Sequence, residues 1–154
     1  MLAAHLLLGV LPSLPFVECD HCVNTKNSTV PETVWRPAHE AYGPLFTLLR
    51  GRQWVFTAGA ITTDARASMR SNVFTTHDGR RMVAPLVSVV APNQHQTNVT
   101  IVLPSSLTPS SVTVWAPGDV EGTAVGWNVA HGHELTAIAV PLHMDGCAVV
   151  VVEG

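Results

Sequence analysis

The feature that most constrains the fold is a change of hydrophobic period after Gly51. From residue 52 onward, short runs alternate apolar and polar positions, which is the pattern of half-buried β-strands. Turn-forming pairs such as Asp78-Gly79 and Asp145-Gly146 separate most of the runs. We expect eight strands, over residues 52–58, 70–76, 81–90, 97–103, 111–116, 125–130, 134–142 and 147–153. The chain is therefore predicted to be mainly β, an antiparallel β-sandwich of about eight strands preceded by a short helical segment.

The spacing of apolar positions in residues 37–50 predicts a helical segment that leads into the sandwich. Their apolar positions recur at helical spacing and form one face, made of Ala38, Tyr42, Leu45, Phe46 and Leu49. Pro44 has no N–H to donate to the Glu40 carbonyl, so we expect two short helices or one kinked helix. The preceding residues 23–35 are rich in turn formers and predict a loop.

The first sixteen residues leave two alternatives open. Their apolar run and following prolines are compatible with a secretory signal peptide, although no Lys or Arg occurs before Lys26. Such a leader would make the protein secreted or extracellular, and the localisation is otherwise unknown. The other alternative is a short buried helix over residues 2–9, ended by Gly9. The run is shorter than the roughly 20 residues that a membrane-spanning helix needs, so no membrane association is predicted.

The charge pattern excludes nucleic-acid binding. Charged residues make up 12% of the 154-residue chain, against about 25% in average domains, and the net charge is -3. The longest basic run is Arg80-Arg81, which cannot neutralise a phosphate backbone. The chain is long enough for one domain with its own core.

The hexapeptide VECDHC, residues 17–22, is the most suggestive chemical motif. Cys19 and Cys22 could begin a zinc site, but a structural site needs four ligands, and the other candidates are His131 and His133. A disulfide between the two cysteines, a redox pair and an inert loop are the alternatives. The remaining histidines show no ligand spacing, and we find no catalytic motif. The sequence thus predicts no catalytic residue, no metal and no cofactor.

The tryptophans and two sequons supply the candidate binding and modification positions. Trp115 and Trp127 could stack on sugar rings, whereas Trp54 lies among apolar neighbours and is expected in the core. Asn27 and Asn98 begin Asn-X-Ser/Thr tripeptides and would carry glycans in a secreted protein.

Several strings resemble one family. AYGPLFTLLRGRQWVFTAGAI, RSNVF and RRMVAPLVSV are similar to the junction between catalytic barrel and C-terminal sandwich in glycosidase-like (β/α)₈-barrel proteins, broadly of the α-galactosidase type. LLLGVLPSLPFVECDHC resembles the last barrel segment, and GCAVVVVE resembles the last sandwich strand. The resemblance implies that Asp20 and His21 lie at the substrate-facing rim of the barrel. It also implies that the catalytic carboxylates belong to earlier barrel strands that this chain does not contain.

Three functions remain open at this stage. The resemblance favours a non-catalytic sandwich domain, with residues 1–35 as the end of a barrel, 36–51 as a linking helix and 52–154 as the sandwich. Its partner would be the catalytic barrel of the parent protein, and its apolar residues 1–16, Leu45, Phe46 and Leu49 would be partly uncovered without it. The alternatives are a secreted carbohydrate-binding module and a small zinc protein.

Overall fold

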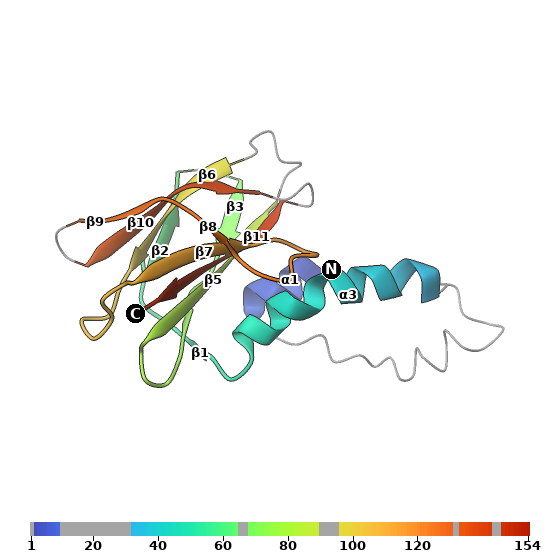
Figure 1. Cartoon of the computed structure of the whole chain (residues 1–154), viewed down its shortest axis with the longest axis horizontal. Coiled ribbons are helices and arrows are strands. Elements are labelled where there is room, and N and C mark those ends of the chain that lie inside the picture. The colour runs from blue at the N-terminus through green and yellow to red at the C-terminus, as the bar shows by residue number, and fades with distance from the viewer. Residues whose placement is uncertain (1, 10–31, 65–67, 90–95, 131–132, 143–145) are drawn as a thin grey trace.

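The computed structural model of the chain describes residues 2–9, 32–64, 68–89, 96–130, 133–142 and 146–154. Within these residues, the chain forms two antiparallel sheets, a large one and a small one, and helices α1 and α3 pack on the large sheet (Figure 1). The order of the three layers is helices, large sheet and small sheet. The predicted mainly β, antiparallel sandwich is confirmed. None of the described helices is long and apolar enough to span a bilayer.

The large sheet has seven strands and the small sheet has four. The large sheet runs in the order β1 (Gln53–Trp54), β4 (Phe74–Thr75), β5 (Arg81–Ser88), β11 (Cys147–Glu153), β7 (Ser111–Trp115) and β8 (Thr123–Ala124), and β3 (Met69–Ser71) also pairs with β5. The small sheet runs in the order β2 (Ile61–Thr63), β6 (Gln96–Val102), β10 (Glu134–Pro141) and β9 (Trp127–Ala130).

The short strands are where sequence and structure differ. Strands β2 and β8 were not expected, and the single strand predicted over residues 70–76 is divided into β3 and β4. The division falls opposite Pro85, which has no N–H to donate, and there Asn72 N–H donates to the Pro85 carbonyl at 3.3 Å. The hairpin predicted at Asp78-Gly79 joins β4 to β5, and Gly79 has the positive φ of 68° that such turns require.

Strand β11 lies at the centre of the molecule and is buried on both faces. Val150 and Val152 pack between the two sheets in the inner core, whereas Val149 and Val151 face the helices. We call the second group of apolar side chains, between the large sheet and the helices, the helix-facing cluster. Burial on both faces explains why the sequence of β11 is a continuous apolar run with no alternation.

Helix α1 (Leu2–Leu8) is part of this helix-facing cluster. Leu6 is completely buried, and α1 contacts both α3 and β5. Asn72 Nδ2 donates to the Leu7 carbonyl at 2.7 Å, which fastens the C-terminal end of α1 to the sheet. Gly9 ends the helix with a φ of 64°, as the sequence predicted. This packing favours the buried-helix alternative for residues 2–9.

Helix α3 (Glu32–Leu49) is one helix with two internal prolines, and it begins earlier than expected. The prediction of a loop up to residue 35 is wrong for the last four of those residues. The prediction that its apolar face is partly uncovered is also wrong, because Leu45, Phe46 and Leu49 are at most 7% exposed. That face packs against α1 and the large sheet, which supply the cover that we had assigned to a barrel.

Candidate functional site: an aromatic edge and the cleft beside it

The residues of the VECDHC motif lie outside the described part of the chain. The motif contains Asp20 and His21, and Asn27 and His131 elsewhere in the sequence also lie outside the described residues. Their proposed roles in substrate contact, glycosylation or metal binding therefore stay predictions. Within the described residues, no group of three or more His, Cys, Asp or Glu side chains could hold a metal ion.

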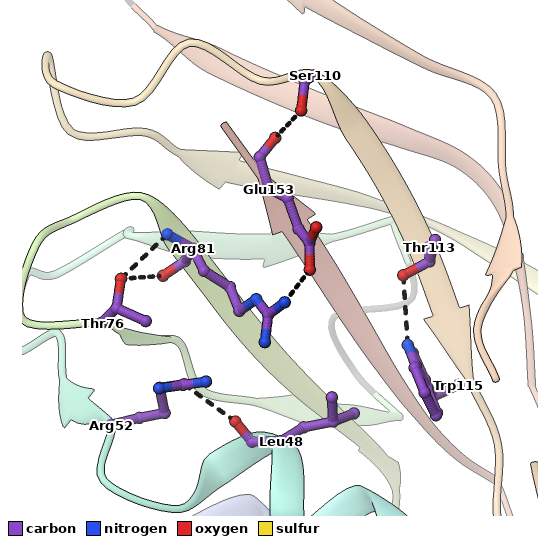
Figure 2. Close-up of polar contacts among 8 residues, drawn as sticks. All are labelled: Leu48, Arg52, Thr76, Arg81, Ser110, Thr113, Trp115 and Glu153. Atoms are coloured by element: carbon purple, nitrogen blue, oxygen red, sulfur yellow. Dashed lines mark hydrogen bonds and ion pairs between the residues drawn. The ribbon is translucent and has the colours of Figure 1, made fainter. Parts of the chain in front are cut away.

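Trp115 and Trp127 are both half-buried. Trp115 packs against the helix-facing cluster, and its Nε1–H donates to Thr113 Oγ1 at 3.3 Å (Figure 2). Gly122 covers the ring closely, since a Cβ there would lie 2.3 Å from the indole nitrogen. Trp127 pairs with Ala137 and packs against the inner core. Sugar stacking on these two rings stays a prediction, and each ring already has a packing role.

Trp54 is not a core residue, contrary to the expectation from its apolar neighbours. It is 42% exposed and Phe56 is 81% exposed, with 4.3 Å between their ring centroids. Trp54 also stacks on buried Phe74 at 6.4 Å. The expectation fails because β1 is a two-residue strand at the edge of the large sheet. Strand β4 pairs with one side of it, and no described strand pairs with the other side. We call Trp54 and Phe56 the aromatic edge.

A cleft of about 310 Å³ opens beside this edge, where the chain crosses from β1 to β2. The side of the 53–57 segment that lines it is the one opposite the aromatic rings, with Gln53, Val55 and Thr57. Gln53 Nε2 and His77 Nδ1 lie 3.4 Å apart on its rim. The cleft therefore joins residues from both sheets and from the β4–β5 hairpin.

A second hollow, of about 280 Å³, gathers several charges at the end of the large sheet. Arg81 forms an ion pair with Glu153, and Arg52 Nε donates to the Leu48 carbonyl at 3.1 Å, at the C-terminal end of α3 (Figure 2). The helix dipole at that end also favours the Arg52 cation. These guanidinium groups have structural partners within the chain, so the hollow by itself does not indicate a ligand.

Asp78 in the neighbouring hairpin is also used structurally. Thr76 Oγ1 donates to its carboxylate at 2.5 Å, and the Arg80 N–H donates at 3.1 Å. The hydrogen bond from Thr76, followed by that from Arg80, holds the pKa of the Asp78 carboxyl below its ordinary value. The carboxylate thus stabilises the turn.

Asn98 lies in β6 and is exposed, but its amide oxygen is already engaged. Asn98 Oδ1 accepts a hydrogen bond from the Ala139 N–H at 2.9 Å, where β10 departs from regular pairing and Ala139 has a φ of 52°. Glycosylation at this position stays a prediction.

Comparisons with known proteins give no family for the chain. No family model matches it, and no curated protein matches it. Two solved structures share part of its architecture. A cycloisomaltooligosaccharide glucanotransferase from Paenibacillus sp., complexed with cycloisomaltoheptaose, has a TM-score of 0.45 and 13% identity over 60% of this chain and 16% of its own. Alpha-L-fucosidase isoenzyme 2 from Paenibacillus thiaminolyticus has a TM-score of 0.45 and 21% identity over 71% of this chain and 17% of its own.

Both names describe carbohydrate-active enzymes, and the chain spans about a sixth of the length of each. A TM-score below 0.5 is too low for either enzyme to carry an argument about function. The proposals below therefore rest on the residues and geometry of this chain.

Proposed function

We propose that this chain is a non-catalytic β-sandwich domain of a glycoside-hydrolase-like protein, which packs against a catalytic barrel through the aromatic edge. The observation that carries the proposal is the exposure of Phe56 and Trp54. Both lie in LRGRQWVF, within the string that resembles a barrel–sandwich junction.

The energetics support an interface at this edge. Burying a phenylalanine side chain is worth about 1.5–3 kcal/mol, and Phe56 in the isolated chain obtains little of that stabilisation. Aromatic residues and arginine are enriched in the centres of interfaces, and Arg52 precedes the aromatic pair. Trp54 is also held in place by its stacking on Phe74, so a partner would meet a preformed surface.

The role of Asp20 and His21 at the rim of such a barrel belongs to the same proposal, as does the division into barrel end, linking helix and sandwich. Helices α1 and α3 both pack on the large sheet, so a barrel partner would meet N-terminal residues that are already attached to the sandwich. The catalytic groups would then lie in the partner barrel.

The first experiment is to isolate the native protein with an antibody against this chain and to measure its intact mass and N-terminal sequence. We expect a polypeptide longer than 154 residues, or a stable complex with a barrel protein. A native 154-residue chain that purifies alone would overturn the proposal. Hydrolysis of aryl glycosides by the purified chain would also overturn its non-catalytic part.

The edge itself is tested by Phe56→Ser, with Ile138→Ser as the matched control. Ile138 is 44% exposed and lies in β10 of the small sheet, whereas β1 belongs to the large sheet. In analytical ultracentrifugation of the isolated chain, we expect Phe56→Ser to reduce concentration-dependent association and Ile138→Ser to leave it unchanged. Equal association by both variants and the parent chain would argue against the edge as an interface.

A further inference from the structure

The cleft beside the aromatic edge has an apolar floor. Met82, Ala60 and Leu103 lie beneath it and are each at most 4% exposed, so the apolar surface that a ligand could reach belongs to Val55, Val102 and Pro104. The frame around the floor is held by main-chain bonds, since Val102 N–H donates to the Ala60 carbonyl at 2.9 Å.

The rim of the cleft is polar, and none of the described residues that line it is a carboxylate, a lysine or an arginine. It consists of one amide, one imidazole and three hydroxyl groups, from Gln53, His77, Thr57, Thr75 and Thr76. The Gln53 amide and the Thr57 hydroxyl can both donate and accept hydrogen bonds, whereas the Thr75 and Thr76 hydroxyls already donate within the hairpin. In the tautomer that leaves His77 Nδ1 unprotonated, the Gln53 amide donates to it and the two side chains orient each other.

This combination selects for one kind of ligand. A volume of about 310 Å³ lies at the lower end of the range for ligand pockets. An apolar floor favours a molecule with one face of C–H groups. A rim with several donor–acceptor groups and no full charge favours a neutral molecule with several hydroxyl groups. A pyranose ring has both properties.

We propose that the cleft between β1, the β4–β5 hairpin and the end of β6 binds a neutral mono- or disaccharide. One face of its ring packs against Val55, Val102 and Pro104, and its hydroxyl groups bond to Gln53 and Thr57. This site uses neither Trp115 nor Trp127, and it lies on the opposite side of the 53–57 segment from the aromatic edge. It is therefore independent of the proposed function, which can fail while this site exists.

The experiment is a titration of the isotope-labelled chain with glucose, galactose, maltose and lactose, followed by two-dimensional amide NMR. We expect shift changes at Gln53, Thr76 and His77, with a dissociation constant on the order of 1 mM for the best sugar. Gln53→Ala should weaken that affinity about tenfold, which is the usual loss for one hydrogen bond. Asn128→Ala, which removes an exposed amide from the small sheet, is the matched control and should bind as the parent does.

Three results would overturn the inference. The first is the absence of shift changes at the rim at the highest sugar concentrations. The second is equal binding of glucuronate or of cyclohexanol, because the rim would then select neither for neutrality nor for hydroxyl groups. The third is unchanged affinity of Gln53→Ala. Because Gln53 is exposed, the variant should remain folded, and the dispersion of its amide signals checks this.

Discussion

The packing of α1 predicts that two leucines two residues apart make very different contributions to the free energy of unfolding. Leu6 is completely buried between α3 and the large sheet, whereas Leu8 on the same helix is 55% exposed. Substitution by alanine changes both residues in the same chemical way and does not lower helix propensity. The pair Leu6→Ala and Leu8→Ala therefore isolates the contribution of burial.

The expected loss of stability at Leu6 and at Leu8 follows from how far each side chain is buried. Leu→Ala removes about three methylene equivalents, each worth about 0.8 kcal/mol when buried, so the transfer loss at Leu6 is about 2.4 kcal/mol. The neighbouring helix and strand hold the vacated space open, and the cavity raises the total to about 3–4 kcal/mol, within the range for buried leucines. At Leu8 more than half of the side chain stays in water, so we expect about 1 kcal/mol or less.

Urea unfolding followed by far-ultraviolet circular dichroism measures both values. With a slope of about 1–3 kcal/mol per molar urea, Leu6→Ala should lower the midpoint by about 1–4 M and Leu8→Ala by at most a fraction of that. Equal, small shifts for the two variants would refute the reasoning. They would mean that residues 2–9 contribute no packing, as expected of a cleavable leader.

Two further predictions concern the turns. The pKa of Asp78 is lower in the folded chain than in the unfolded chain, so its stabilising contribution is present above the unfolded pKa and is lost as pH falls through the folded pKa. A carboxyl-carbon NMR titration should give a midpoint below that of an unstructured aspartate, and a midpoint at or above it would contradict the hydrogen bonding described. Gly146→Ala should destabilise the chain by about 1–2 kcal/mol from backbone strain alone, since Gly146 has a φ of 67°. Its new Cβ would also lie 2.5 Å from Ser88 Cβ, whereas Gly126→Ala meets open space and should stay within about 0.5 kcal/mol of the parent when both variants are unfolded in urea.

Most of the secondary structure could be predicted from the sequence. Alternation located β6 and β7, the Asp-Gly pair located the β4–β5 hairpin, and Gly9 marked the end of α1. These signals are local, because side-chain alternation and turn geometry depend on a few adjacent residues. The short strands β2 and β8, of three and two residues, carry no such signal and form only because a longer strand lies beside them.

The candidate site could not be predicted in this way. Sequence reasoning selected Trp115 and Trp127 because they are large aromatic residues, and it assigned Trp54 to the core by its neighbours. The exposed position of Phe56 and the cleft lined by Gln53 and His77 depend on where β1 ends and on what lies beside it. No local pattern contains that information, since the cleft joins residues about 50 positions apart in the chain.

By itself, the sequence determined that the chain would form short antiparallel strands with an apolar helix before them, because period and turn chemistry are properties of neighbouring residues. Only the tertiary structure decided which faces are covered. Val149 and Val151 are buried because α1 and α3 lie on that side of the large sheet, and Trp54 is partly exposed because no described strand pairs with the outer side of β1. The second face of a sheet is buried by segments that are distant in the sequence. How these segments dock depends on contacts that no single segment specifies.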